Sequence, residues 1–444
     1  MSLLLGWPDL PESTSQIGFV RSATPCPAKR PVADPSAEGH WLCVAPTGAG
    51  KSASFAIPQL LSYPGSVIAV DVKGELVATT ARWRAALGEV LVLDPFDLFP
   101  GRGGGFDPLG HLDPADPSLV DDAYTLAALF SSLPAGGRNK DPFWDEWGQD
   151  LIAAFIVHAV RSPDPSKRSL AEVYRRISAD DQIYSTAVML DTETVHPFTK
   201  AKLGAWLSLP EVTRGGVTAT VCQQVRMLAG PGVQRSFARD SIDMQALAEG
   251  APSTVYLVLP PDRLASHSAL VRIVLTALVQ RMLRRRHRPE TPTLFMVDEA
   301  AQLGPIPALM SAITLGRGFG LRAALLVQSL AQLRTAYDTQ FETLLENCSL
   351  LTMGPHTAFS MARQLAEQGF GDVSADTLFR LGRDGVMIRA NGEPSRRLRK
   401  LDYRRDEMFK GRFDANPLYQ PARVPRRDVG PQLELPWTSG AATA

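Results

Sequence analysis

Eight residues near the N-terminus have the types and order of a phosphate-binding loop. The sequence Ala-Pro-Thr-Gly-Ala-Gly-Lys-Ser occupies positions 45–52 and follows the apolar run 41–44. Backbone N–H groups that converge at the start of a helix favour an anionic phosphate, and glycine lets the backbone approach it closely. We therefore predict that a nucleotide is bound by Pro46, Thr47, Gly48, Ala49, Gly50, Lys51 and Ser52.

Two side chains of this loop are expected to do separate chemistry. Lys51 would reach the β- and γ-phosphates, and the hydroxyl of Ser52 would bind Mg²⁺. The usual pattern begins with glycine where this chain has Ala45, so we expect Ala45 to keep a negative φ. The alternative is a Gly-rich turn ahead of a surface helix.

A second motif lies far downstream. Positions 293–297 are an apolar run, and Asp298 and Glu299 follow it directly. A buried strand that ends in two acids predicts a Walker B motif, in which Asp298 binds Mg²⁺ and Glu299 polarises the attacking water. The alternative is an Asp-Glu pair that caps the next helix and has no catalytic role.

Length and composition indicate a multidomain, intracellular, soluble protein. The 444 residues are too many for one compact core. There are 46 Lys and Arg against 46 Asp and Glu, so any contact with nucleic acid must come from a local patch. Cys26, Cys43, Cys222 and Cys348 lack the spacing of metal ligands or of a disulfide framework, and we expect reduced thiols. No apolar stretch reaches the ~18 residues of a membrane-spanning helix.

Short β-rich runs alternate with helical runs in both halves of the chain. This alternation predicts an α/β fold with a mostly parallel sheet. Strands are expected at residues 41–44, 66–70, 89–93, 254–259, 293–297, 321–327, 349–353 and 385–388.

The middle of the chain has a different pattern. From Asp116 to Ser236 strand signals disappear and helical periodicity dominates, which predicts an all-α domain that interrupts the nucleotide-binding domain. The predicted segments are a Pro-rich N-terminal stretch 1–40, the first half of the nucleotide-binding domain 41–115, the all-α domain 116–236, the second half of the nucleotide-binding domain 237–420, and a disordered tail 421–444.

The residues around the two nucleotide motifs resemble the coupling ATPases of conjugative type IV secretion systems, a TraG/TraD-like family. The similar segments occur in the family's order and span residues 40–410. They are Ile57-Pro58-Gln59-Leu60-Leu61, Tyr63-Pro64-Gly65-Ser66-Val67, Asp71-Val72-Lys73-Gly74-Glu75, Val92-Leu93-Asp94-Pro95-Phe96, Asp141-Pro142-Phe143-Trp144, Gly304 to Gly320, and Val327 to Leu333.

This resemblance implies a RecA-like P-loop NTPase fold, ATP and Mg²⁺ as cofactors, and a homo-hexameric ring. ATP hydrolysis would drive delivery of the relaxosome, single-stranded DNA or a protein substrate to the type IV secretion channel proteins. Family members usually begin with two membrane-spanning helices, which the first 40 residues do not show. We therefore expect a cytoplasmic protein, peripheral at the inner membrane, whose membrane contact is indirect.

Two further residues gain expected roles from position and resemblance. Gln328 ends the predicted strand 321–327, so in a parallel sheet it would emerge beside Lys51 and Asp298 and sense the γ-phosphate. Arg317 lies between glycines, and the resemblance implies an arginine finger that acts in a neighbouring subunit's site. The alternatives are a strand-end amide satisfied by the backbone and a solvated loop arginine.

Other charged groups are left without an assigned role. Asp71, Lys73 and Glu75 close the second predicted strand and suit a structural ion pair as well as a nucleotide contact. Grouped arginines could neutralise nucleic-acid phosphates or belong to solvated surfaces. They occur at 281–288, at 396–405, and at Arg423, Arg426 and Arg427.

Two other functions stay open. A double-stranded DNA translocase that resembles the septal chromosome pumps would share the sheet domain but lack the helical block 116–236. A receptor that binds ATP without motor work and docks secretion substrates would not need Glu299. For the motor, the residues expected to act in catalysis are Lys51, Glu299, Gln328 and Arg317.

Overall fold

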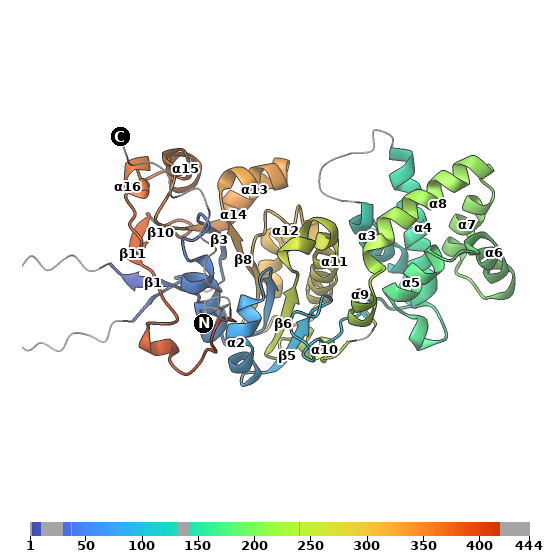
Figure 1. The fold of residues 1–444 in the computed structure, drawn as a ribbon, viewed down its shortest axis with the longest axis horizontal. Coiled ribbons are helices and arrows are strands. Elements are labelled where there is room, and N and C mark those ends of the chain that lie inside the picture. The colour runs from blue at the N-terminus through green and yellow to red at the C-terminus, as the bar shows by residue number, and fades with distance from the viewer. Residues whose placement is uncertain (1, 10–29, 37, 132–141, 239, 418–444) are drawn as a thin grey trace, which may run out of the picture.

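The computed structural model describes residues 2–9, 30–36, 38–131, 142–238 and 240–417. Within these ranges, a long sheet with helices on both faces adjoins a group of helices at one end of the molecule (Figure 1). Cys26, Asp141 and the predicted tail with its arginines lie outside the described residues. The disordered tail therefore stays a prediction.

The sheet has 11 strands in the order β2-β1-β11-β10-β9-β3-β8-β7-β4-β6-β5. Neighbouring strands run parallel from β9 to β5, and the pairings from β9 through β10 to β2 are antiparallel. Every strand that the sequence predicted is present, so the mostly parallel sheet is confirmed. The strands are β1 (Leu4–Pro8), β2 (Val32–Ala33), β3 (His40–Val44), β4 (Val67–Asp71), β5 (Glu89–Leu93), β6 (Ser253–Val258), β7 (Thr293–Val297), β8 (Leu321–Val327), β9 (Cys348–Met353), β10 (Gly385–Arg389) and β11 (Arg396–Arg399).

The parallel strands are buried on both faces, which is why they form unbroken apolar runs in the sequence. In β7, Leu294 and Met296 pack on one side of the sheet, and Phe295 and Val297 pack on the other. Side chains alternate between faces along a strand, so each apolar run supplies two apolar layers. The first face is covered by α1 (Ile57–Ser62) and α2 (Glu75–Ala85), and the second by α11 (Leu264–Leu283) and α12 (Pro307–Thr314).

The helical region is built around α4 (Pro142–Val160). Residues 151–157 of α4 are at most 1% exposed, because neighbouring helices enclose this apolar stretch. The apolar core of the region continues through α3 and α11 into the core on the second face of the sheet. Around α4 lie α3 (Leu119–Ser131), α5 (Leu170–Ile177), α7 (Pro197–Leu207) and α8 (Glu211–Val225), with α6 (Gln182–Thr192) against α7.

Between β5 and β6 the described residues form helices and no strand. The exact domain boundaries at 116 and 236 stay a prediction. None of the described helices is both long and apolar enough to cross a bilayer. The remaining helices are α9 (Pro231–Ser236), α10 (Met244–Glu249), α13 (Leu330–Tyr337), α14 (Phe341–Asn347), α15 (Phe359–Gln364) and α16 (Ala375–Phe379).

The antiparallel end of the sheet was not visible in the sequence pattern. β1 comes from the segment that we described only as Pro-rich, and it pairs with β11 so that Trp7 lies opposite Arg399. β11 has the sequence Arg-Arg-Leu-Arg, in which only Leu398 is buried. β1 is short and depends on a partner from the other end of the chain, and β11 is short and mostly charged although it also pairs with the nearby β10, so local patterning predicts neither.

A buried ion pair ties the N-terminal segment to the parallel sheet. Arg322 in β8 pairs with Asp34, and neither side chain has exposed surface. Asp34 also accepts a hydrogen bond of 2.9 Å from the indole N–H of Trp41, and Arg322 donates to the carbonyl of Gly39 at 2.8 Å. A buried charge without its partner is costly, so segment 30–36 and β8 stabilise each other.

We predict that Asp34→Ala lowers the free energy of unfolding by roughly 3–5 kcal/mol, because the guanidinium of Arg322 loses its buried counter-charge. Urea denaturation followed by tryptophan fluorescence measures the change. The control is Asp414→Ala, which breaks a pair with Arg82 whose side chains are 44% and 54% exposed. It should cost at most about 1 kcal/mol. Equal effects of the two substitutions would contradict the prediction.

Candidate active site at the carboxyl edge of the sheet

Three adjacent parallel strands bring the predicted nucleotide motifs to one edge of the sheet. β3, β8 and β7 are consecutive, and their carboxyl ends lead into the loop 45–52, Gln328 and Asp298. Parallel strands end at the same edge, so the predicted convergence of these motifs is confirmed. The N–H of Ala45 also donates to the carbonyl of Val327 at 3.1 Å, which joins the loop to the end of β8.

The phosphate-binding loop has the backbone expected of it. Gly48 and Gly50 have φ values of 82° and 92°, which glycine adopts at little cost. Ala45 is not among the described non-glycine residues with positive φ, as we expected. Lys51 begins a helical segment that runs through a π-helical turn, η1 (Ser52–Ala56), into α1. The unpaired N–H groups at the start of this helix are suited to an anion.

The ammonium of Lys51 is held against the start of the loop. Its Nζ donates to the carbonyl of Ala45 at 2.7 Å and reaches that of Pro46 at 3.5 Å, and the residue is 8% exposed. An ammonium group has three donors, so these contacts leave capacity for a phosphate oxygen. Lys51 therefore lies where a buried positive charge can meet a bound anion.

Asp298 is a buried acid with a second acid, Glu299, next to it in the chain. It is 4% exposed, and burial raises the pKa of its carboxyl to about 6, with a further rise from Glu299 and opposing effects from Lys73 and Lys51. One of its oxygens accepts the N–H of Glu299 at 3.0 Å, which leaves the other for a cation. Mg²⁺ needs few protein ligands and prefers oxygen, so Asp298 and the hydroxyl of Ser52 fit this ion chemically.

Two amide side chains hold the carboxylate of Glu299. Its two oxygens accept hydrogen bonds from Nε2 of Gln328 at 3.1 and 3.0 Å, and Oε2 also accepts one from Nε2 of Gln302 at 3.1 Å. Glu299 has a φ of 51°, a conformation that costs about 1–3 kcal/mol for a residue with a side chain. The strained backbone and the two amides together fix the carboxylate at the strand end. Sequence reasoning missed Gln302, although its place one turn after Glu299 was a usable signal.

Arg317 lies at the opposite edge of the sheet. It belongs to the turn η5 (Gly316–Phe319) just before β8, whereas Gln328 follows β8. The 7 residues of β8 separate the two edges by about 23 Å at 3.3 Å per residue. The Arg317 side chain is 67% exposed and pairs with Glu38 at 3.3 Å. Arg317 therefore does not reach the loop 45–52 of its own subunit.

Asp71 and Glu75 make structural contacts. Oδ2 of Asp71 accepts the N–H of Val77 at 2.9 Å near the start of α2, and burial raises the pKa of Asp71 to about 7. Glu75 accepts a hydrogen bond of 3.2 Å from Nδ2 of Asn416, while Lys73 is exposed. These contacts support their omission from the predicted catalytic set.

A segment that we treated only as a basic cluster borders the phosphate-binding loop. A cavity of about 690 Å³ is lined by residues 47–50 and by residues between Arg399 and Asp406, after β11. Nζ of Lys400 donates to the carbonyl of Ala49 at 2.7 Å and also to that of Gly354. Burial lowers the pKa of Lys400. Lys400 therefore clamps the loop to the antiparallel end of the sheet, a role that its place in an arginine-rich run concealed.

The sequence model of the family described as Type IV secretory system Conjugative DNA transfer matches residues 28–368. The chain belongs to this family. Two relatives named Conjugal transfer protein TraG, from Agrobacterium fabrum and Escherichia coli, are 25% and 27% identical over 303 and 354 residues, which cover 67% and 74% of this chain. Type IV secretion system-coupling protein VirD4 of Bartonella quintana is 24% identical over 339 residues, or 74% of this chain. These matches cover 45%, 54% and 52% of the relatives, so the chain spans about half of their length.

Solved structures of the plasmid coupling protein TrwB have the same fold as this conjugative DNA transfer family member. The TrwB complex with ADP and Mg²⁺ has a TM-score of 0.63 and 18% identity, and the match covers 83% of this chain and 87% of TrwB. The TrwB complex with the GTP analogue GDPNP has a TM-score of 0.64 at 18% identity, with the same coverage. The predicted RecA-like P-loop NTPase fold is confirmed.

We predict that Lys400→Met loosens the phosphate-binding loop without unfolding the protein. A hydrogen bond from a charged donor contributes about 1.5–3 kcal/mol, so amide exchange in residues 45–52 should quicken at least about tenfold. Hydrogen–deuterium exchange with mass spectrometry measures this rate. Lys410→Met is the control, because Nζ of Lys410 is exposed and lies 3.5 Å from Glu407. Unchanged exchange in Lys400→Met would show that its contacts do not hold the loop.

Proposed function

We propose that this protein is an ATP-hydrolysing coupling protein that recruits and moves a substrate to a type IV secretion channel. The substrate would be DNA, as a relaxosome or a single strand, or a protein. The observation that carries the proposal is the meeting of Lys51, Asp298 and the hydrogen-bonded Glu299–Gln328 pair at one sheet edge. Membership of the conjugative DNA transfer family supports the biological setting.

ATP and Mg²⁺ are the proposed ligands of the carboxyl edge. Residues 46–52 would hold the phosphates, with Lys51 as their charge partner, and Ser52 and Asp298 would hold Mg²⁺. Burial raises the pKa of Asp298, and a divalent cation beside this carboxyl would offset the cost of keeping it charged. The TrwB complex with ADP and Mg²⁺ supports this assignment. Bound Mg²⁺ would supply positive charge to the phosphates during transfer.

Glu299 is the proposed base for the attacking water. Glu299 is 7% exposed, and amide donors orient its carboxylate without giving it a proton. The amide of Gln328 that holds Glu299 is also the proposed sensor of the γ-phosphate. If the amide of Gln328 turned to donate to a phosphate oxygen, Glu299 would lose one of the two amides that hydrogen-bond its carboxylate. The carboxylate could then accept the proton of the water.

Arg317 is proposed to act on the site of a neighbouring subunit in a homo-hexameric ring. Its place at the opposite sheet edge and its exposure suit a group that projects to another copy. The residues Leu315 and Phe319 that flank it are 68% and 37% exposed. Large apolar side chains around an exposed arginine are typical of a protein interface. A subunit interface there would cover them and supply positive charge to the next ATP site.

We propose that the ring lies at the cytoplasmic face of the inner membrane as a peripheral assembly. Its contact with the membrane would be made through the channel proteins. The names of the relatives, conjugal transfer protein and type IV secretion system-coupling protein, support this setting. A septal-type double-stranded DNA translocase is disfavoured by the helices between β5 and β6. A receptor that binds ATP without motor work is disfavoured by the ordered carboxylate of Glu299.

The proposal is tested by steady-state ATP hydrolysis of the purified protein with and without single-stranded DNA. We expect turnover that DNA stimulates and that Lys51→Ala abolishes, because the phosphates lose their charge partner. Glu299→Gln should bind ATP as tightly as the parent but turn over about 10²–10⁴-fold more slowly, because the base acts in the transition state.

Glu342→Gln serves as the control for loss of an acid. Glu342 pairs with Arg334 on the surface, and its side chain is 65% exposed, so turnover should not change. If the parent protein formed rings and was as inactive as Lys51→Ala under both conditions, the motor would be excluded and the docking receptor supported.

Arg317→Ala and Lys51→Ala should complement each other in mixed rings. Each variant alone should lose about 10³-fold or more in turnover, because each removes charge that stabilises the transferring phosphoryl group. A mixed ring contains interfaces that join an intact Lys51 to an intact Arg317 of the next subunit, so some of the activity should return. Hydrolysis by an equimolar mixture measures this recovery. Mixed rings without recovery would place Arg317 outside the site.

A further inference from the structure

A second large cavity lies at the amino edge of the sheet, away from the nucleotide motifs. Its volume is about 890 Å³. One wall is the end of α11, where Arg285 donates to Oγ1 of Thr293, the first residue of β7, at 2.8 Å. Asp298 follows the other end of β7, so the two sites occupy opposite edges. The walls are the loop 110–113 before α3, residues Gln245, Ala248 and Glu249 of α10, and residues from Arg281 to His287.

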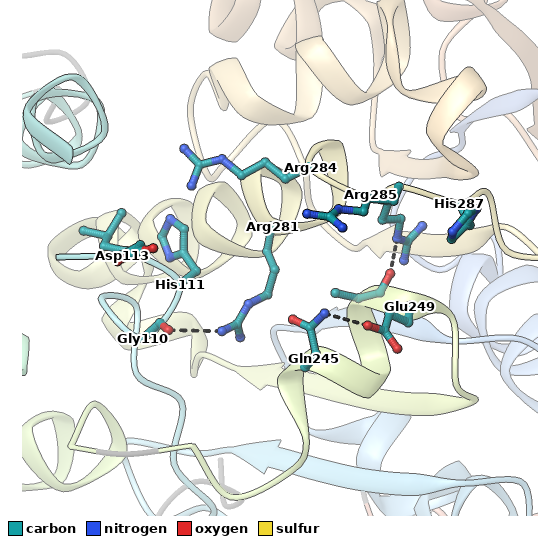
Figure 2. Close-up of a pocket in the computed structure, with 12 residues that line it drawn as sticks. Gly110, His111, Asp113, Gln245, Glu249, Arg281, Arg284, Arg285 and His287 are labelled. Carbon is teal, nitrogen blue, oxygen red and sulfur yellow. Dashed lines mark hydrogen bonds between the residues drawn. The ribbon is translucent and has the colours of Figure 1, made fainter. Parts of the chain in front are cut away.

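Two of the arginines that line this cavity are bound within the fold by hydrogen bonds or an ion pair. Arg285 donates to the carbonyl of Phe319 at 3.0 Å and is half-buried among backbone oxygens. Arg284 pairs with Asp122 at 2.5 Å, and Figure 2 shows its side chain directed away from Gln245 and the Gly110 loop. These two residues therefore belong to the structural ends of α11 and α3.

Arg281 and Arg286 present positive charge to this cavity. Arg281 runs from α11 into the space between the Gly110 loop and Gln245 (Figure 2), where its Nη2 donates to the carbonyl of Gly110 at 3.1 Å. The carboxylate of Asp240 lies 4.0 Å from Arg281, whose side chain is 18% exposed. Arg286 is exposed, and it makes no hydrogen bond or ion pair with the described residues.

His111 adds a polar group with an unused nitrogen to the same wall. Its Nε2 lies 3.3 Å from Oε1 of Gln280, while its buried Nδ1 has no hydrogen-bond partner among the described residues. Burial and the neighbouring Arg281 and Arg284 lower the pKa of His111 to about 4, so the ring is neutral at pH 7. Because the amide oxygen of Gln280 can only accept, Nε2 carries the proton of the neutral ring and Nδ1 can accept one hydrogen bond from a donor group of a ligand.

We propose that this cavity binds the phosphate backbone of a nucleic-acid strand. Guanidinium groups bind phosphate oxygens in a bidentate way, Arg281 from the wall and Arg286 from the rim. At the rim, residues 286–288 are exposed, and Arg286 and Arg288 carry positive charge there, Arg288 also pairing with Glu38. Charges spaced along an open rim suit a chain of phosphates better than one small anion. The loop 110–113 leads into the helical region and α10 follows it, so a bound strand would contact both junctions with the sheet. The proposal rests on the proposed function for one point only, which is the choice of nucleic acid as the partner.

The test is the binding of a fluorescent single-stranded oligonucleotide, measured by anisotropy at several salt concentrations. It uses Lys51→Ala protein without ATP, so that its outcome is independent of ATP hydrolysis. Arg281→Gln combined with Arg286→Gln should weaken binding. It should also reduce the slope of log K against log salt by about 1.4, because each lost phosphate contact removes about 0.7.

A second variant keeps both arginines, because Arg281 also contacts the fold. Gln245→Glu places a carboxylate on the cavity wall beside Arg281, in the first turn of α10. It removes the amide that donates to Oε1 of Glu249 at 2.7 Å and leaves a like-charge pair that an exposed helix tolerates. It should weaken oligonucleotide binding by repelling phosphate. The matched control is Arg363→Gln, which removes an exposed arginine of α15 at the other end of the sheet (Figure 1) and should leave binding unchanged.

Unchanged affinity and salt slope in both cavity variants would overturn the proposal. So would the absence of oligonucleotide binding to the Lys51→Ala protein at about 50 mM salt, where phosphate contacts are strong. A fluorescent ATP analogue tests whether the cavity binds the phosphates of a nucleotide instead of those of a nucleic acid. If it still bound to Lys51→Ala protein and the arginine substitutions removed that binding, the cavity would be a second nucleotide site and the nucleic-acid proposal would fail.

Discussion

The candidate active site depends on the parallel alignment of β3, β8 and β7. Because these neighbours run in one direction, their carboxyl ends place the loop 45–52, Gln328 and the pair Asp298–Glu299 within one short edge. The strands are buried on both faces, so the packing of two apolar layers holds this alignment. A reversal of any one strand would carry its polar end to the opposite edge, where Arg317 lies.

This alignment concentrates charge, and the surrounding contacts offset it. The carboxyl of Asp298 has a raised pKa because it is buried beside Glu299. Lys51 donates to the carbonyl at the start of the phosphate-binding loop, and Lys400 donates to a carbonyl in its middle. Glu299 keeps an uncommon backbone conformation while two amides hold its carboxylate. These contacts fix the positions of the charged groups at this edge.

The features that could be predicted from the sequence are those with a strong local signal. Parallel strands such as β7 and β8 are apolar on both faces, so their bounds were visible, and the motifs at their ends identified Lys51 and Asp298. β1 was missed because it is short and pairs with the distant β11, and β11 was missed because three of its four residues are arginines. Lys400 was hidden in a basic run because its contact with Ala49 depends on how the chain returns to the sheet.

The sequence by itself determined the phosphate-binding loop, the acidic strand end and the order of sheet and helices, because each follows from residue type and short-range periodicity. Only the tertiary structure decided which strands are neighbours and which charges meet. It brought the amide of Gln328 to the carboxylate of Glu299 and the ammonium of Lys400 to the phosphate-binding loop. It also placed Arg281 and Arg286 around a cavity at the other edge of the sheet. Such contacts join residues far apart in the chain, and their formation depends on strand order and packing, which no local pattern records.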